Sequence, residues 1–527
     1  MIFNTLIKSI DEERIKCIGY VYGESFKPRH WFQFADDTAI VTSTEEDSQA
    51  LLNVFTKWSH WADLIIHLKK CFTFGLKKNG KKACQFKPYL KINNGMIPAI
   101  DIGDNFKYLG KEFSFDMDTT RIKEKLEDKI KNYFEKLDRL PLHPKNKMKI
   151  ISIYIYSKIK WEFSIYDLSI TWVKQHLDSI VKSKVKRWLQ LHPGGNFDHL
   201  KLPATKLGLN FLLPSDIYDQ CKLSIRNILK SSKNEDIKLL AEATKDKNIK
   251  YENLLTENSY KAADKALKKV REDTVTNHLE TLKESNSIMG FIKNHTSNIF
   301  LNKWKTICDS LPKNIFVFVR KALIFALPNK TNLLRWKISN DDKCNLCYQK
   351  ETQLHMLSFC NTALKEGRYT WRHNSVMSTM LWYLKQLNGI NVLADLPGHR
   401  NPAELFTASR PDIVLYDKNT LTIVELTVCF DTNPIKSRNG KIVKYSDIQK
   451  ELTKVHGQKK INKIFVEITN LGFVTTNIKD FTNLFKNTDI NTTRMISKMT
   501  EVAIRCSFYI YIRRNKPWTN PEILVYY

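Results

Sequence analysis

Three cysteines and one histidine within 17 residues set the strongest local constraint on how this chain can fold. They are Cys344, Cys347, His355 and Cys360 in the segment CNLCYQKETQLHMLSFC, with the spacing C-x2-C-x7-H-x4-C. Zn²⁺ takes four sulfur and nitrogen ligands in a tetrahedron, and a C-x2-C turn places two thiolates on one ion. We expect a structural zinc site, because four protein ligands leave no open coordination position. The alternative is a chance spacing of buried cysteines.

The other cysteines follow no pattern. They lie far apart in the chain, as is typical of reduced thiols in an intracellular protein. The N-terminal stretch MIFNTLIKSIDEERIK lacks a basic region ahead of a sustained apolar core, which predicts no secretion signal. These seven cysteines are Cys17, Cys71, Cys84, Cys221, Cys308, Cys429 and Cys506.

The charge balance indicates a polyanionic partner. The chain has 84 lysines and arginines against 55 aspartates and glutamates over 527 residues, a formal net charge of +29. Nucleic acid is favoured over a membrane surface, because no apolar run approaches the roughly 20 residues that span a bilayer. We therefore expect a nucleic-acid partner and no membrane. The length predicts about three to four domains.

Two adjacent carboxylates stand between two β-prone runs in WFQFADDTAIVTSTEEDS (Trp31–Ser48). The pattern predicts a β-hairpin with Asp36 and Asp37 at its tight turn. Phosphoryl transfer by two metals needs carboxylates that hold Mg²⁺ ions about 4 Å apart, and rigid strands can present them to a nucleic-acid end. A pair of aspartates at a turn is otherwise an ordinary solvated turn.

The motif FADD resembles the catalytic hairpin of reverse transcriptases, and its neighbours agree in order. In ADLIIHLKKCFTFGL (Ala62–Leu76), Lys70 matches the family lysine near the incoming triphosphate, and FKYLG (Phe106–Gly110) resembles the primer-grip turn. The resemblance implies Mg²⁺ at Asp36 and Asp37. It also implies that the basic helices after residue 116 form a thumb, which contacts duplex phosphates without reading bases. An ordinary helix-to-strand join and an ordinary hairpin are the alternatives.

The sequence departs from the reverse-transcriptase pattern upstream of this hairpin. The family's first metal-binding aspartate lies well before FADD on another strand, whereas only 35 residues precede Asp36 here. We expect half a metal site, a palm without its fingers, and no independent DNA synthesis.

A second carboxylate pair stands in RPDIVLYDKNTLTIVELTV, where twelve residues separate Asp412 from Glu425. If PDIVLY and LTIVELTV are adjacent antiparallel strands joined at DKNT, the two side chains can meet at one edge of a sheet. PD-(D/E)-x-K nucleases arrange carboxylates for Mg²⁺ in this way. The signal is weak by itself, because Pro-Asp often opens a strand. Thr427 stands where that motif has its lysine. Glu467 in KIFVEI is a lesser candidate for the nuclease site, and we expect it on an exposed strand surface.

The same region resembles non-LTR retrotransposons that carry a restriction-like endonuclease. Their nuclease moves the lysine to the next helix as K-x2-K-Y, which KIVKY matches with Lys441, Lys444 and Tyr445; Lys441 and Lys444 can share one helical face. The Cys/His spacing, the preceding hydrophobic hairpin FVRKALIFALPNKTNLLRW and the following GRYTWRHN also recur there. The resemblance implies that Arg372 and His373 contact DNA phosphate or support the metal ligands, and that Tyr445 lies at the nucleic acid.

The ordered motifs predict a multidomain α/β chain. The resemblance implies target-primed reverse transcription in the nucleus, in which the nuclease nicks target DNA and the polymerase copies element RNA from the exposed 3′ hydroxyl. The alternatives are a catalytically inactive nucleic-acid-binding remnant and a domesticated cellular protein. The expected domains are a partial reverse-transcriptase palm (1–115), a thumb (116–230), a helical linker (231–340), a zinc knuckle (341–362) and a PD-(D/E)xK-like α/β endonuclease (363–510).

Overall fold

The computed structural model describes most of the chain and divides it into two compact units. The first unit comprises Met1–Glu135, Tyr156–Leu177 and Pro214–Lys268, and the second comprises Lys136–Ile155, Asp178–Leu213 and Lys269–Tyr527. Most of residues 244–294, the middle of the expected helical linker, lies outside the described part. The described residues are 2–14, 19–21, 26–80, 82–101, 103–114, 118–203, 206–243, a few single residues between 265 and 292, 295–406, 410–446 and 459–523.

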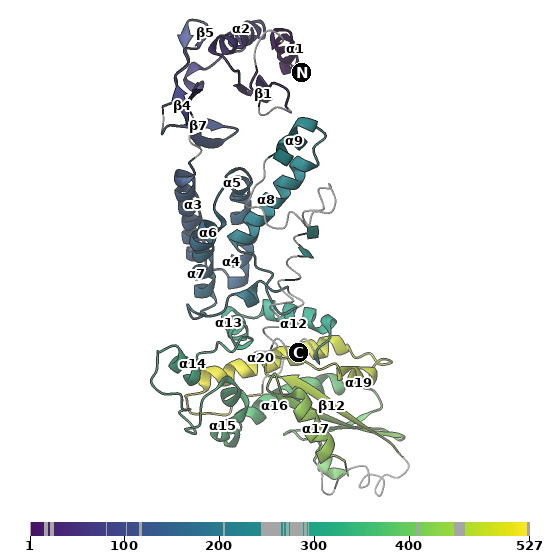
Figure 1. The fold of residues 1–527 in the computed structure, drawn as a ribbon. Helices are drawn as coiled ribbons and strands as arrows, with labels where there is room; N and C mark the ends of the chain where they lie inside the picture. Colours follow the sequence, from purple (N-terminus) through teal and green to yellow (C-terminus); the bar gives the residue numbers. More distant parts are fainter. Residues whose placement is uncertain are drawn as a thin grey trace. The chain divides into compact units, whose positions relative to one another are not determined.

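The first unit begins with two helices that pack beside a β-hairpin (Figure 1). The elements are α1 (Ile2–Arg14), β1 (Trp31–Phe34), β2 (Asp37–Ile40) and α2 (Glu45–Trp61). The expected hairpin is present, because Phe34 pairs with Asp37 across the turn. The turn itself consists of Ala35 and Asp36, one residue earlier than expected. Helices α1 and α2 share a small core of Leu6, Ile10, Leu51 and Trp58.

Three further hairpins follow in the first unit, each an antiparallel sheet of two strands. The third one carries FKYLG: Leu109 and Gly110 form a two-residue turn with positive φ angles of 47° and 76°. Such angles match the right-handed twist of the flanking strands. The strands are β3 (Gly75–Asn79), β4 (Lys82–Phe86), β5 (Lys91–Ile92), β6 (Gly95–Met96), β7 (Asn105–Tyr108) and β8 (Lys111–Ser114).

The basic helical region expected after residue 116 is helical. Helix α3 (Thr120–Arg139) has apolar residues three or four positions apart, which line one face and are buried, while its many lysines lie on the other faces. The buried residues of α3 are Ile122, Leu126, Ile130, Phe134 and Leu137. Other helices of this region are α4 (Pro144–Ile150), α5 (Lys160–Ile165), α6 (Ile170–Trp172), α7 (Ser179–Trp188), α8 (Pro214–Lys230) and α9 (Glu235–Ala243).

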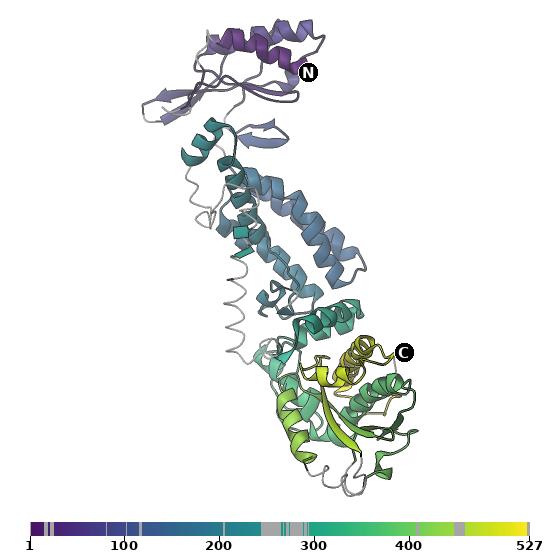
Figure 2. The same ribbon diagram turned by 90° about the vertical axis from the view of Figure 1, so that its right-hand side faces the viewer.

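The C-terminal part of the second unit is an α/β arrangement around one four-stranded sheet (Figure 2). The strand order is β12-β11-β10-β9, with β9, β10 and β11 antiparallel and β12 parallel to β11. Helix α17 connects the two parallel strands. The elements are α15 (Asn361–Lys365), α16 (Arg368–Leu384), β9 (Asn391–Ala394), β10 (Ile413–Tyr416), β11 (Thr420–Cys429), α17 (Pro434–Lys444), β12 (Lys460–Thr469), α19 (Ile478–Asn483) and α20 (Thr492–Arg513).

The two faces of this sheet meet different layers. Successive side chains of a strand point to opposite faces. On β11, Val424 and Leu426 join the large core formed with α16 and α20, whereas Ile423 joins a smaller cluster that includes Tyr445 at the end of α17. Glu425 therefore faces α17. This alternation determines which strand residues can contact α17.

The apolar segment ahead of the Cys/His cluster is helical as expected, but only its first helix is buried; in α14 (Lys330–Arg335), Asn332 is the one buried residue. All residues of α13 (Lys313–Ala322) from Ile315 onward are buried. Helix α12 (Asn298–Ser310) is joined to the sheet by Trp304, whose indole N–H donates to the Leu471 carbonyl at 2.6 Å and whose ring stacks on Phe473. None of the described helices is long and apolar enough to cross a lipid bilayer.

Gly472, three residues after the end of β12, has no room for a side chain. Its φ is +77°, and a Cβ there would lie 2.8 Å from two atoms of Thr500 on α20. Gly398 has the same φ of +77° with open space around it.

Substitutions at these two glycines should lower the free energy of unfolding by two separable amounts. Gly398→Ala should lower the free energy of unfolding by about 1–2 kcal/mol, the cost of a left-handed conformation. Gly472→Ala should lower it by a further 1–3 kcal/mol or so, because an extra methyl group is forced into a packed core. Urea unfolding of both variants measures the difference. Equal losses would show that Thr500 moves aside without cost.

Candidate metal centres

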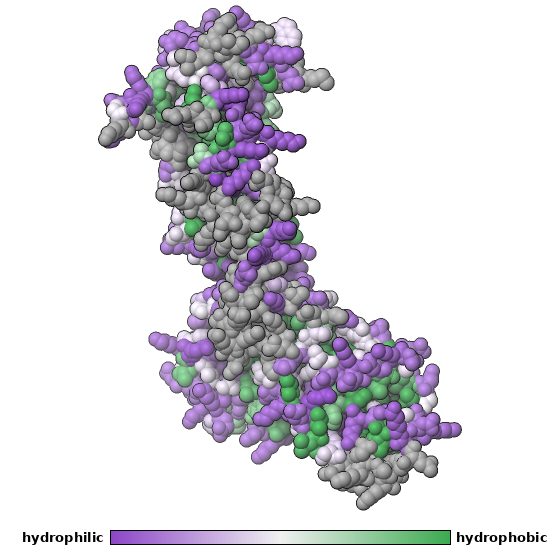
Figure 3. Space-filling model, turned by 45° about the vertical axis from the view of Figure 1, so that its right-hand side comes forward, coloured by the Kyte–Doolittle hydropathy of each residue, from purple (hydrophilic) through white to green (hydrophobic). Residues whose placement is uncertain are grey.

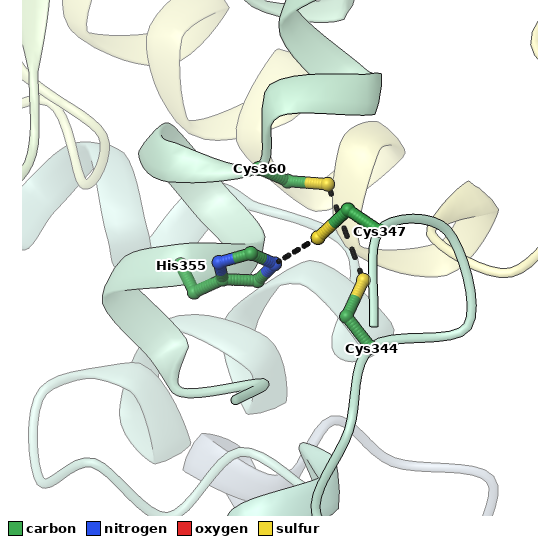
Figure 4. Close-up of side chains that lie close together, drawn as sticks. All are labelled: Cys344, Cys347, His355 and Cys360. Atoms are coloured by element: carbon green, nitrogen blue, oxygen red, sulfur yellow. Dashed lines mark hydrogen bonds between the residues drawn. The ribbon is translucent and has the colours of Figure 1, made fainter. Parts of the chain in front are cut away.

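The three cysteines and the histidine converge as the spacing predicts (Figure 4). Their ligand atoms all lie within 4.8 Å of one another, and they form the one group of three or more metal-ligating side chains in the described part of the chain. Cys347 Sγ lies 3.2 Å from His355 Nε2, and Cys344 Sγ lies 4.0 Å from Cys360 Sγ. The C-x2-C pair lies on a tight turn, and a short π-helix, His355–Phe359, carries the histidine and ends at Cys360.

Backbone and side-chain hydrogen bonds hold this arrangement in shape. The Leu346 N–H donates to Cys344 Sγ at 3.4 Å, and the Cys360 N–H donates to the Tyr369 hydroxyl at 3.1 Å. That hydroxyl in turn lies 3.2 Å from the His355 carbonyl oxygen. Tyr369 is on α16, so the cluster is attached to a helix that packs on the four-stranded sheet.

The donor set fits zinc. Burial, together with the neighbouring cysteines, raises the pKa of Cys360 to about 12, and burial also raises the pKa of Cys344. Burial lowers the pKa of His355, which keeps its imidazole neutral and able to bind a metal. A soft divalent cation stabilises the thiolates that burial disfavours, and three sulfurs with one nitrogen are a common structural zinc set.

The second carboxylate pair lies at the start of β10, between the two central strands of the four-stranded sheet. Ile413 pairs with Val424 in the antiparallel register, so Asp412 and Glu425 are the next residues opposite each other. The Asp412 N–H donates to Glu425 Oε1 at 3.0 Å, and the Leu426 N–H donates to Asp412 Oδ2 at 2.9 Å. The expected antiparallel pairing is confirmed, and with it the meeting of the two side chains.

Lys441 lies between these carboxylates, and Lys444 does not. The Lys441 ammonium is 2.6 Å from Glu425 Oε2 and 3.5 Å from Asp412 Oδ2. The Lys444 side chain is exposed, with its ammonium 5.0 Å from the centre of the Tyr445 ring. The two lysines lie three residues apart on α17, and of the two, in the described part of the chain, only Lys441 is paired with the carboxylates.

His373 on α16 supports Asp412 from the other side. Its Nε2 lies 3.5 Å from Asp412 Oδ2 and 3.2 Å from the Leu426 carbonyl oxygen. Burial opposes ionisation of Asp412, but the hydrogen bond from His373 and the charge of Lys441 outweigh it and lower the pKa of Asp412. Burial and the charge of Asp412 raise the pKa of Glu425. The pKa of Lys441 is raised, because the two carboxylates outweigh its burial.

Two expected nucleic-acid contacts do not fit the structure. Arg372 is 1% exposed, and its Nη1 donates to the Ser507 hydroxyl inside the core at 3.1 Å. Tyr445 is also 1% exposed, and its hydroxyl donates to the Arg410 carbonyl at 3.1 Å. Both side chains are part of the interior of the α/β part. Because they are buried, neither can reach a phosphate at the surface.

Sequence reasoning missed or misread three residues near this centre. Glu467, expected on an exposed surface, is 2% exposed and binds Arg438 Nη1 at 3.2 Å. Asp395 follows β9, and its N–H donates to the Asp412 carbonyl at 2.9 Å. In the sequence, Arg438 could have been recognised by its position one helical turn before Lys441. Glu467 could have been recognised by its place in the otherwise apolar run IFVEI.

The first carboxylate pair is more open. Asp36 and Asp37 are both exposed on the β1–β2 hairpin. Tyr108, in FKYLG, has a raised pKa through burial and the charge of Asp37, so the two hairpins lie close together. Lys70 ends a short 3-10 helix, Leu68–Lys70, with an exposed side chain. Within the described residues, no ion pair or hydrogen bond joins Lys70 to either aspartate.

Comparison with known proteins identifies the relatives of this chain. No family model matches it. The Pol polyprotein from the type-2 retrotransposable element R2DM of Drosophila melanogaster is 23% identical over 435 residues, which are 80% of this chain and 39% of that protein. The R2 Pol polyprotein of Nasonia vitripennis is 21% identical over 423 residues, 78% of this chain and 38% of that protein. The homologues of this chain are R2 retrotransposon Pol polyproteins.

The R2 relationship covers most of this chain but a minority of its relatives. The chain spans about two fifths of the length of the two curated R2 proteins that it matches over most of its residues. A third R2 Pol polyprotein, from Popillia japonica, is 22% identical over 177 residues, 33% of this chain and 24% of that protein. The long alignments extend well beyond either carboxylate pair alone.

The Cys/His cluster predicts one tightly held Zn²⁺ per chain. Cys360→Ser should abolish zinc retention and lower the thermal unfolding temperature, because metal binding is coupled to folding. Cys84→Ser, at an exposed cysteine outside the cluster, is the matched control and should retain zinc. Elemental analysis of protein purified without chelator measures the metal. Wild-type protein without zinc would contradict the assignment.

Proposed function

We propose that the C-terminal α/β part is a divalent-metal-dependent DNA endonuclease of the PD-(D/E)-x-K type. The observation that carries this proposal is the convergence of Asp412, Glu425 and Lys441, which come from two adjacent central strands and the following helix. The relatives are retrotransposon Pol polyproteins, whose element must enter DNA. A restriction-like nuclease joined to a reverse transcriptase accounts for both observations.

The side chains of Asp412 and Glu425 fit Mg²⁺. Mg²⁺ binds oxygen ligands, usually one or two carboxylates with water and phosphate oxygens completing the shell. Asp412 and Glu425 supply the carboxylates. In the described part of the chain, the hydrogen bonds of the Asp412 carboxylate go to Oδ2, so Oδ1 retains its lone pairs. Mg²⁺ held here would polarise the scissile phosphate and lower the pKa of an attacking water.

The chain's own residues supply orientation and charge. Lys441 offsets the repulsion between the two carboxylates, and its ammonium can donate to a water or a phosphate oxygen placed beside Glu425. His373 fixes the Asp412 carboxylate through Oδ2. The Asp412 N–H holds Glu425 Oε1, and the Leu426 N–H holds Asp412 Oδ2, so one oxygen of each carboxylate is fixed by the backbone of the opposite strand. This pre-organisation lowers the reorganisation needed during hydrolysis.

We propose a reverse-transcriptase palm in residues 1–115 and a thumb in residues 116–230, a range that contributes to both compact units. The β1–β2 hairpin would present Asp36 and Asp37 to Mg²⁺, with Lys70 near an incoming nucleotide and the β7–β8 turn at the primer. Complete polymerase chemistry takes a further carboxylate from another strand, and the described residues place no third metal-ligating side chain beside this pair. The partners are element RNA and target DNA, and the proposed place of action is the nucleus.

The charge of the chain supports both proposals. A formal net charge of +29 favours phosphate backbones. Hydrophilic residues are common on the visible face of the C-terminal part, with several hydrophobic patches between them (Figure 3). Binding of this kind is expected to weaken steeply as salt concentration rises.

Removal of one carboxylate tests the nuclease directly. With Mg²⁺, the full chain should nick duplex DNA, and Asp412→Asn should abolish nicking because it removes a negative ligand without changing side-chain size. Asp480→Asn, at an exposed aspartate on α19, should nick at the wild-type rate. Plasmid relaxation measures nicking. Equal relaxation by wild type and Asp412→Asn would remove the basis of the proposal.

The two lysines of α17 form a second matched test. Lys441→Ala should lower the nicking rate about 10²-fold or more, the usual scale for a group that assists proton transfer or charge stabilisation. Lys444→Ala should leave the rate nearly unchanged, because its ammonium lies over the Tyr445 ring and, in the described part of the chain, forms no ion pair with either carboxylate. A larger loss of nicking rate for Lys444→Ala than for Lys441→Ala would assign the assisting role to Lys444 instead of Lys441.

An inactive nucleic-acid-binding protein is the second candidate, favoured by the charge alone. It predicts salt-sensitive DNA binding in wild type and Asp412→Asn alike, with no metal-dependent nicking by either. Fluorescence anisotropy with labelled duplex DNA at several salt concentrations, run beside the nicking assay, separates the two functions.

A further inference from the structure

Helix α17 carries two cations on one face, and each binds an acid from a different strand. Arg438 binds Glu467 on β12, and Lys441, three residues later, binds Glu425 on β11. Phe465 pairs with Glu425 in the parallel register, so Glu467 lies two residues beyond the partner of Glu425 and faces the same side of the sheet. The two ion pairs are therefore neighbours beneath one helix.

The Arg438 pair is buried to about the same extent as the Lys441 pair. Arg438 Nη1 lies 3.2 Å and 3.4 Å from the two carboxylate oxygens of Glu467, and it donates to the Phe465 carbonyl at 3.2 Å. The Thr475 hydroxyl donates to Glu467 Oε2 at 2.8 Å. Removing either charge would leave the other buried without its partner, which is strongly destabilising for that contact.

Apolar packing does little to hold α17 in place. Pro434, at its first position, is the one residue of this helix that is buried. Its aliphatic residues Ile435, Ile442 and Val443 are 42%, 42% and 72% exposed. Most helices on a sheet are held by an apolar stripe. Here the contacts on either side of Lys441 are the Arg438 ion pair and the buried Tyr445 just after the helix.

We infer that the Arg438–Glu467 pair positions Lys441 at the nuclease carboxylates. Arg438 fixes the rotation of α17 about its axis, and one turn later this rotation directs the Lys441 ammonium to Glu425 and Asp412. Arg438 is thus a positioning residue that acts through Lys441. The inference rests on the proposed nuclease function for its activity measurement.

Rate measurements on single and combined variants test the inference. Arg438→Met should lower kcat for nicking about 10-fold to 100-fold, the range for residues that support a metal site through another side chain, with KM for DNA little changed. Glu467→Gln keeps the hydrogen bond from Thr475 and should also lower kcat. Lys436→Met, at an exposed lysine on the same helix, is the control and should keep the wild-type kcat.

The combination with Lys441→Ala distinguishes positioning from general support of the fold. If Arg438 acts through Lys441, Arg438→Met should cause no further loss of kcat in the Lys441→Ala background. A full additional loss in that background would overturn the inference. Arg438→Lys should restore part of the rate lost in Arg438→Met, because it keeps the charge on the same face.

Two controls keep the outcomes separate. The double variant Arg438→Met/Glu467→Met removes both buried charges together, so it should fold with a near-wild-type circular dichroism spectrum while kcat stays low. A wild-type rate in this folded double variant would overturn the inference and leave the nuclease standing. Absence of nicking by wild type would instead contradict the proposed function.

Discussion

The register between β10 and β11 determines the carboxylate centre of this protein. That register places Asp412 opposite Glu425, and the N–H of Asp412 binds the carboxylate of its neighbour at 3.0 Å. Two negative groups held this close repel each other, so the arrangement needs a compensating cation. Lys441 provides one charge. A shift by one residue in either strand would turn one carboxylate to the opposite face and remove the centre.

The surrounding layers explain why the register is firmly set. On one face, Val424 and Leu426 are buried against α16 and α20, and on the other Ile423 packs near Tyr445. A slip by one residue would turn Glu425 to the face that packs against α16 and α20, away from Lys441, and this penalty specifies the pairing. Helix α16 also carries His373 to Asp412 and Tyr369 to the Cys/His cluster. One helix thus contacts both candidate metal centres, which makes the cluster a structural part of the α/β half.

Local patterns predicted the elements of these centres, and contacts between distant segments determined the rest. The spacing from Cys344 to Cys360 and the strands around Asp412 and Glu425 follow from short-range signals. The burial of Arg372 and Tyr445 does not, because it depends on α20 and on the backbone of Arg410, far away in sequence. Glu467 looked like an exposed strand residue for the same reason: its partner Arg438 lies 29 residues before it. The β1–β2 hairpin was predictable, but the placement of its turn was wrong by one residue.

Anomalous X-ray scattering from crystals of the full chain, grown with Mn²⁺ in place of Mg²⁺, tests the central claim most directly. The account predicts an Mn²⁺ peak that contacts one oxygen of Asp412 and one oxygen of Glu425 at about 2.1 Å, the distance at which Mg²⁺ binds oxygen. A carboxylate pair that binds no Mn²⁺ at saturating concentration, with Lys441 still paired to Glu425, would contradict it.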